Sequence, residues 1–238
     1  MMGRVLLAAL LSGIAAGLFM SGIQAWKVTP LIIAAESYEG QETGHHQHGA
    51  EETAAEETGH DHGTAWAPED GFERIAFTVL SNIIAGVAFS LVLTAVIMFL
   101  GLDMSPGHGA MLGFAGFIAV SLAPSAGLSP ELPGMPAAEL MARQTWWWGT
   151  VVATGIGIGV IAIIANPLAK AGGAAMIALP HVIGAPHPVS QDSAVPAVLA
   201  AQFAANSLVT AAVFWVVLGA LLGWALSRVY KGTEPVPE

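Results

Sequence analysis

The stretch IAFTVLSNIIAGVAFSLVLTAVIMFLGL, residues 75–102, decides the fold, because it is long, mostly apolar and contains no charged residue. A helix needs roughly 20 apolar residues to cross the hydrocarbon core of a bilayer. Residues 75–102 exceed that length, and they therefore predict a transmembrane helix.

The composition of the whole chain agrees with a membrane protein. Hydrophobic residues make up 55% of the chain and charged residues only 10%, whereas about a quarter of the residues in a soluble domain are charged. The chain has no cysteine, which excludes disulfides and thiolate metal ligands. The net charge is −10 and most acids lie in the first half. This acidity argues against nucleic acid as a partner and suits a cation.

Further apolar segments lie on both sides of residues 75–102 and predict an all-α, polytopic membrane helix bundle. The first, between Arg4 and Lys27, is interpreted as an uncleaved anchor. The others cover residues 110–123, 145–169, 171–180 and 195–227. Residues 110–123 and 171–180 are short for a crossing, and Pro180 and Gly184 break the second of them. The bundle is expected to have about six transmembrane helices, or about five if one short segment only enters the bilayer.

These segments divide the chain into four parts. Residues 1–35 form the first transmembrane helix, residues 36–70 a His- and Glu-rich loop, residues 71–230 the helical bundle and residues 231–238 a tail. The lysines and arginines near the predicted spans place both termini in the cytoplasm. The chain is therefore expected to be a multi-pass membrane protein whose His-rich loop faces outward, to the periplasm or the cell exterior.

Glycines at helical spacing suggest where these helices touch. The pairs Gly13 and Gly17, Gly109 and Gly113, Gly155 and Gly159, and Gly219 and Gly223 all fit the small-residue pattern of membrane helix packing. With 28 glycines in the chain, chance spacing is the alternative for each pair.

The predicted outer loop contains the stretch ETGHHQHGAEETAAEETGHDH, residues 42–62. It has too few large apolar residues to fold by itself and should be flexible. Imidazole binds Co²⁺, Ni²⁺ and Zn²⁺, and nearby carboxylates attract cations. We expect this loop to collect a divalent metal ion through its five histidines, His45, His46, His48, His60 and His62. The alternative is a solvated acidic spacer.

A second candidate metal site lies in proline-rich segments expected on the same side of the membrane. In LPHVIGAPHP, residues 179–188, the prolines should interrupt the helix and leave backbone carbonyls unpaired. His181 and His187 lie there, and Glu131 and Glu139 lie in the facing segment. We predict that these four residues form a rim that strips water from the cation and passes it inward. As alternatives, His181 bonds a carbonyl freed by the prolines, His187 is a surface loop residue, and Glu139 pairs with Arg143 four residues later.

Several of these pieces resemble the CbtA family of predicted cobalt transporter subunits. The matching pieces are VLLAALLSGIAAGL, the histidine loop, WAPEDGFERIAFT, SLAPSAGLSPELPGMPAAEL, RQTWWW, LPHVIGAPHP and FWVVLGALLGW. The resemblance covers nearly the whole chain. It implies an inner-membrane subunit of a cobalt uptake system with a small, one-span, histidine-bearing partner of the CbtB type. Ala65 departs from the acidic residue expected before Trp66.

Together these features predict a transporter subunit for a divalent metal, with Co²⁺ as the first candidate and Ni²⁺ or Zn²⁺ as alternatives. The chain lacks the HExxH and GxSxG patterns, so we do not expect an enzyme. A metal-sensing or scaffold subunit is the alternative, followed by a membrane metalloenzyme. The expected partners are the lipid bilayer and the CbtB-type subunit, without nucleic acid, and a homo-oligomer is left open.

Overall fold

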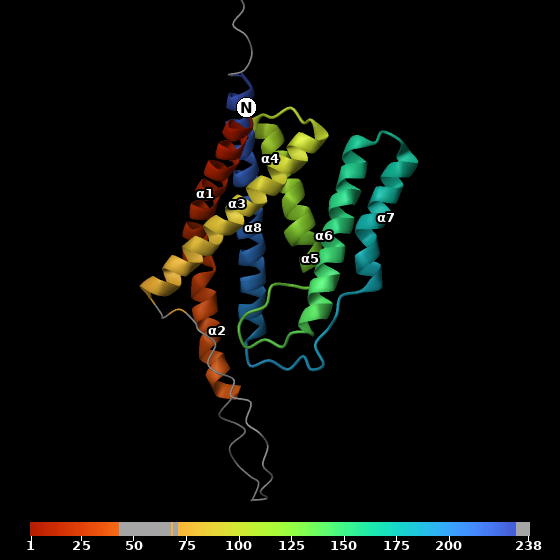
Figure 1. Ribbon diagram of the computed structural model, residues 1–238. Coiled ribbons are helices and arrows are strands. Elements are labelled where there is room, and N and C mark those ends of the chain that lie inside the picture. Colours follow the sequence, from red (N-terminus) through yellow and green to blue (C-terminus); the bar gives the residue numbers. More distant parts are fainter. Residues whose placement is uncertain (43–67, 69–70, 232–238) are drawn as a thin grey trace, which may run out of the picture.

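The computed structural model of the protein describes residues 1–42, 68 and 71–231 (Figure 1). All regular structure in these residues is helical, which confirms the predicted all-α bundle. In chain order the elements are α1 (Met2–Lys27), α2 (Thr29–Glu42), α3 (Phe72–Leu100), α4 (Pro106–Phe117), the π-helix η1 (Ile118–Leu122), α5 (Ala123–Ser125), α6 (Leu140–Ile163), α7 (Pro167–Ile183) and α8 (Ala197–Lys231).

Five described helical stretches are long and apolar enough to cross a membrane: α1, α3, Pro106–Ser125, α6 and Ala197–Tyr230. Residues 110–123, one of the two segments predicted to be short, lie in a full-length span, because α4, η1 and α5 follow one another without a break. Helix α7 has 17 residues, a length of about 25 Å at 1.5 Å per residue. It falls just short of a full crossing, although it runs back across the bundle beside α6 (Figure 1).

Two predicted helix boundaries are wrong around α7. The fourth span was expected to reach Ala169, but α6 ends at Ile163. A new helix then begins because the Asn166 side chain accepts a hydrogen bond from the Leu168 amide and Pro167 occupies the first turn. The expected break at Pro180 is also absent, because Pro180 lies within α7, which continues to Ile183.

The first predicted segment also differs. Helix α1 ends at Lys27, and after a turn at Val28 the chain continues as α2 to Glu42. The first residues of the segment predicted as a loop, 36–42, are therefore helical.

Close glycine contacts join the helices in pairs. Gly13 and Gly17 of α1 meet α3, where a Cβ added at Gly13 would lie 2.5 Å from the Cα of Val87. Gly109 and Gly113 of α4 meet Gly219 and Gly223 of α8, with an added Cβ at Gly109 only 2.9 Å from the Cα of Gly223. These contacts confirm three of the four predicted glycine pairs.

The fourth glycine pair was predicted on the wrong face of α6. Nothing lies within 4 Å of a Cβ added at Gly155 or Gly159. Gly157, between them, faces α7 instead, where its added Cβ would lie 2.6 Å from the carbonyl oxygen of Gly173. The α6–α7 hairpin is closed by this contact.

Helix α8 runs through the centre of the bundle. Its Leu218, Leu222 and Leu226 are almost completely buried in the main apolar core, which they share with residues of α1, α3 and α4. A polar contact also joins α1 to α3, because Asn82 donates to the side-chain oxygens of Ser21 and Gln24, at 3.1 Å and 2.6 Å. The α6–α7 hairpin, by contrast, packs mainly on α4, η1 and α5.

The helices end at two opposite faces of the bundle (Figure 1). We call one the loop face, since residues 126–139 and 184–196 connect helices there and α2 ends beyond it. We call the other the terminal face, since it holds the N-terminus, the turn at residues 164–166 and the end of α8. At the loop face, Glu131 and Glu139 lie in the first of the two connections and His187 lies in the second.

Candidate metal-handling site

The loop face is organised by a small apolar core that is separate from the main one. Ala35 of α2, Leu132 of the 126–139 connection and Val195 of the 184–196 connection are buried together. Helix α2 is fixed to the start of α3 as well, because the Glu36 carboxylate forms an ion pair with Arg74. The loop face is therefore a packed structure in which separate segments hold one another in place.

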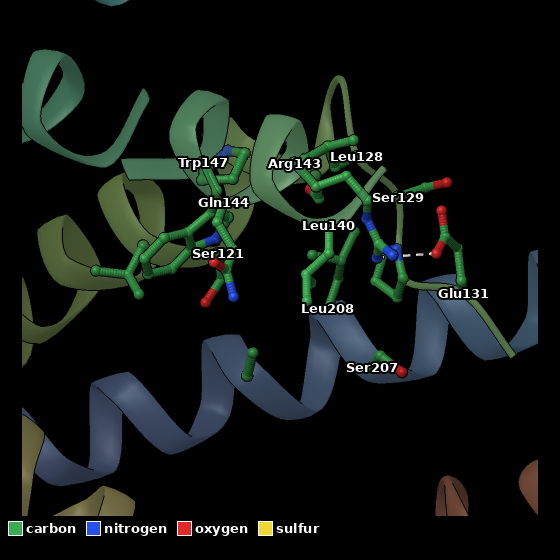
Figure 2. A pocket seen from close by; sticks show the side chains of 15 residues that line it. Ser121, Leu128, Ser129, Glu131, Leu140, Arg143, Gln144, Trp147, Ser207 and Leu208 are labelled. Carbon is green, nitrogen blue, oxygen red and sulfur yellow. Dashed lines mark ion pairs between the residues drawn. The ribbon is translucent and has the colours of Figure 1, made fainter. Parts of the chain in front are cut away.

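A hollow of about 450 Å³ opens beside this core, between η1, α5, the start of α6 and α8 (Figure 2). Its polar lining is contributed by five different segments: Ser121 of η1, Ser125 of α5, Ser129 and Glu131 of the connection, Arg143 and Gln144 of α6, and Ser207 of α8. Trp147 and Leu208 are among its apolar walls. We call it the Glu131 hollow.

An ion pair lies in the Glu131 hollow. A terminal nitrogen of the Arg143 guanidinium is 2.9 Å from a carboxylate oxygen of Glu131 (Figure 2). The two side chains are 32% and 24% exposed, so the pair is partly shielded from solvent. The alternative pairing of Arg143 with Glu139 is not what the structure shows, because the carboxylate of Glu139 is engaged by backbone amides instead.

The wall formed by η1 has an unusual backbone. A π-helix interrupts the regular α-helical hydrogen-bond pattern, and such single turns often occur at functional sites. Here the interruption covers Ile118–Leu122 and includes Ser121, which lines the hollow. On the facing wall, the hydroxyl oxygen of Ser207 is buried and has no hydrogen-bond partner within the described residues.

Glu139 lies at a second hollow, of about 590 Å³, on the other side of α6. It caps α6, because its two carboxylate oxygens accept the amides of Met141 and Ala142 at 2.8 Å and 2.7 Å. These two backbone hydrogen bonds favour the ionised carboxyl and lower the pKa of Glu139. Trp146, Ala185 and Pro186 line the same hollow. We call it the Glu139 hollow.

The two predicted rim histidines are exposed near the Glu139 hollow. His181, in the last turn of α7, packs edge-on against Trp146 with 5.9 Å between ring centroids. The indole nitrogen of Trp146 donates to the carbonyl of Pro180 at 3.2 Å. His187 follows in the 184–196 connection, next to Pro186. The structure thus separates Glu131 and Glu139 into two hollows on either side of the start of α6, and His181 and His187 line neither of them.

A third hollow, of about 380 Å³, lies at the terminal face. Asp103, Met98, Met104 and Tyr230 are among its lining residues. It is the only one of these three hollows at the terminal face, and Asp103 provides its one carboxylate.

No ready-made ligand set is present in the described part of the chain. Within residues 1–42, 68 and 71–231, no three His, Asp or Glu side chains lie close enough together to hold a metal ion. The five histidines of the predicted collecting loop lie outside the described residues. The visible groups can attract a cation and accept hydrogen bonds from its water shell.

The chain matches one known protein family over most of its length. The family model described as "Probable cobalt transporter subunit (CbtA)" matches residues 2–227. The chain belongs to the CbtA family. No curated protein and no solved structure matches the chain.

Membership of the CbtA family and the five apolar spans together describe a multi-pass membrane protein from a family of transporter subunits. The match includes α1 through most of α8, and therefore the lining residues of all three hollows except Tyr230. It agrees with the predicted resemblance over nearly the whole chain.

The sequence did not indicate every residue of the site in this CbtA-family chain. Ser121, Gln144 and Ser207 were not predicted, because a serine or glutamine within an apolar span is as readily a helix-packing residue as a lining residue. The partner of Arg143 was missed for a related reason: Glu131 is twelve residues away, and no local spacing rule relates the two. The proline-rich composition of residues 124–136 was the available signal for a non-helical wall.

Proposed function

We propose that the chain is the membrane subunit of a divalent-metal uptake system in the bacterial inner membrane, with Co²⁺ as its substrate and Ni²⁺ or Zn²⁺ as alternatives. It is a transporter component and no enzyme. The observation that carries the proposal is the CbtA-family match over residues 2–227, supported by carboxylates gathered at hollows of one face.

In this proposal the loop face is extracytoplasmic. The loop histidines His45, His46, His48, His60 and His62 collect the ion, and the rim residues Glu131, Glu139, His181 and His187 pass it into the bundle. The ion then leaves at the terminal face. An inward potential favours this direction by about 2.3 kcal/mol per charge per 100 mV. A one-span, histidine-bearing subunit of the CbtB type is the expected partner.

The test is metal entry into sealed lipid vesicles that contain the chain alone or with its partner subunit, assayed with Co²⁺, Ni²⁺ and Zn²⁺ in parallel. We expect entry of Co²⁺ in at least one of these preparations. If the metal enters only when the partner is present, the chain alone does not form the path. If no metal enters in either preparation, a sensing or scaffold role replaces transport.

Two variants separate collection from passage. Deletion of residues 42–62 should reduce uptake at scarce metal and spare it at plentiful metal, because a collecting loop raises only the local concentration. His181→Ala should reduce uptake at all concentrations. Unchanged uptake across the whole concentration range would remove the corresponding segment from the path.

A further inference from the structure

We propose that the Glu131 hollow receives the divalent cation with its shell of six water molecules intact, and that the cation displaces Arg143 from Glu131 when it binds. This inference rests on the proposed function and deepens it, because it specifies the chemical form of the substrate at the loop face. It also assigns Arg143 the role of a displaceable counter-ion.

The size of the hollow is the first argument. Its volume is about 450 Å³, and one water molecule occupies about 30 Å³ in the liquid. The hollow therefore has space for about fifteen waters, well above the six that an octahedral divalent ion carries. A bare ion would be too small to contact the opposite walls at the same time.

The donor chemistry of the walls is the second argument. Removing the water shell requires several protein ligands that directly replace it. The hollow offers one carboxylate, Glu131, and besides Arg143 its other polar groups are the hydroxyls and amide of Ser121, Ser125, Ser129, Gln144 and Ser207. Such groups hydrogen-bond to coordinated water readily. They are suited to holding a hydrated ion through its shell.

Ser207 gives this argument a specific atom. Its hydroxyl oxygen is buried and has no partner in the described part of the chain, and a buried polar atom without a hydrogen bond is costly. Figure 2 shows Ser207 on α8, at the same end of the hollow as the Glu131–Arg143 ion pair. Because this oxygen has almost no accessible surface, the Ser207 side chain must rotate toward the hollow before a water of the ion's shell can supply the hydrogen bond that it lacks.

The Glu131–Arg143 ion pair explains how the charge of the hollow is balanced before and after the cation binds. While Arg143 is bound at 2.9 Å, it neutralises the one acidic side chain that lines the Glu131 hollow. A divalent ion carries twice the charge of a guanidinium and attracts Glu131 correspondingly more at equal distance. Because Arg143 is 32% exposed, its long side chain can move toward solvent as the ion enters.

The test uses hexaamminecobalt(III), an octahedral ion whose ammonia ligands do not exchange, as a probe that mimics a hydrated cation and cannot coordinate histidine. The full-length protein in lipid nanodiscs is dialysed against the probe in 0.15 M KCl, which screens contacts with exposed acids, and bound cobalt is quantified. We expect saturable binding to the wild type that weakens about tenfold in Glu131→Gln, since one charge-assisted contact is lost.

Arg143→Gln is the decisive second variant, because it breaks the same ion pair from the other side. Removing the competing cation should tighten binding of the probe, whereas Glu131→Gln should weaken it. An ion pair with only a structural role would instead change binding in the same direction in both variants. Asp192→Asn is the matched control, because Asp192 is an exposed loop-face acid that lines none of the three hollows. It should bind as the wild type does.

The outcomes distinguish this inference from the proposed function. The inference is overturned if Glu131→Gln binds the probe as tightly as the wild type, or if Arg143→Gln weakens binding. Co²⁺ entry into vesicles that is insensitive to excess probe would also overturn it while leaving the transport function intact. Failure of all Co²⁺ entry with the partner present would count against the transport function alone.

Discussion

A single methyl group at Gly219 should separate two of the central helices. The Cβ of Gly219→Ala would lie 2.9 Å from the Cα of Gly113 and still closer to the carbonyl oxygen of Gly109. Carbon atoms in contact normally stay at least about 3.5 Å apart. Helices α4 and α8 would have to move apart by about 0.5 Å or more, since the opposing atoms belong to the backbone and cannot change rotamer.

The expected cost follows from overpacking. Forcing extra atoms into a packed interior costs about 1–3 kcal/mol, so the free energy of unfolding of Gly219→Ala should fall by that amount. It can be measured by titrating the protein in mild detergent with SDS and following tryptophan fluorescence. Since α4 continues into η1, whose Ser121 lines the Glu131 hollow, the variant should also weaken binding of hexaamminecobalt(III).

Gly155→Ala is the matched control for this substitution. Gly155 is also a helical glycine, and an added Cβ there has no atom within 4 Å. Alanine is favoured over glycine in a helix by about 0.5–1 kcal/mol, so Gly155→Ala should be neutral or slightly more stable than the wild type. Equal destabilisation by the two substitutions would refute the packing argument, because only Gly219 faces a neighbouring helix.

Three further predictions concern single polar contacts. Acid should weaken the N-terminal cap of α6, because the folded-state pKa of Glu139 is lowered. The stabilisation by Glu139 is therefore present above its unfolded-state pKa and is lost as pH falls through its folded-state pKa. Glu139→Gln should flatten this pH dependence of thermal unfolding. Asn82→Leu removes its hydrogen bonds to α1 and should lower the free energy of unfolding by about 0.6–1.7 kcal/mol in the same SDS titration. Trp146→Phe deletes the donor to the Pro180 carbonyl and should speed amide hydrogen exchange at the end of α7, whereas Trp148→Phe should not.

The overall fold was predicted well from the sequence, because a long uncharged apolar run has few alternatives to a membrane-spanning helix. Residues 75–102 show this directly, since α3 covers Phe72–Leu100. The boundary at Ile163 was missed because residues 164–169 are themselves apolar, apart from Asn166. The turn there depends on one capping side chain and one proline, and hydropathy does not register either of them.

The glycine prediction shows a different limit. Spacing by four residues identifies a face of a helix, but it does not say which neighbour the face meets. In α6 the face that carries Gly155 and Gly159 points away from protein, and a single glycine, Gly157, makes the contact with Gly173. That pairing depends on how α7 folds back on α6. A spacing rule within α6 alone contains no information about it.

The candidate site was predicted in part. A shared side for Glu131, Glu139 and His187 was predicted by alternating the spans, and the connections 126–139 and 184–196 that contain these residues lie at one face of the bundle (Figure 1). The division of Glu131 and Glu139 between two hollows does not follow from it, because α6 begins between them. Glu139 was assigned as a partner of Arg143 by helical spacing, yet residues at a helix start have free backbone amides that compete for a carboxylate. Here the amides of Met141 and Ala142 hold it.

The close contact of Gly109 and Gly113 in α4 with Gly219 and Gly223 in α8 has a consequence for how the chain matures during synthesis. Gly109 leaves the ribosome about 110 residues before its partner Gly219, which is roughly 5–20 s at about 5–20 residues per second. For that interval α4 has entered the membrane with its close-packing surface uncovered. A pause or truncation ahead of α8 therefore leaves an intermediate whose small-residue stripe can associate with the wrong helix, so the last segment to be translated decides whether the earlier ones assemble correctly.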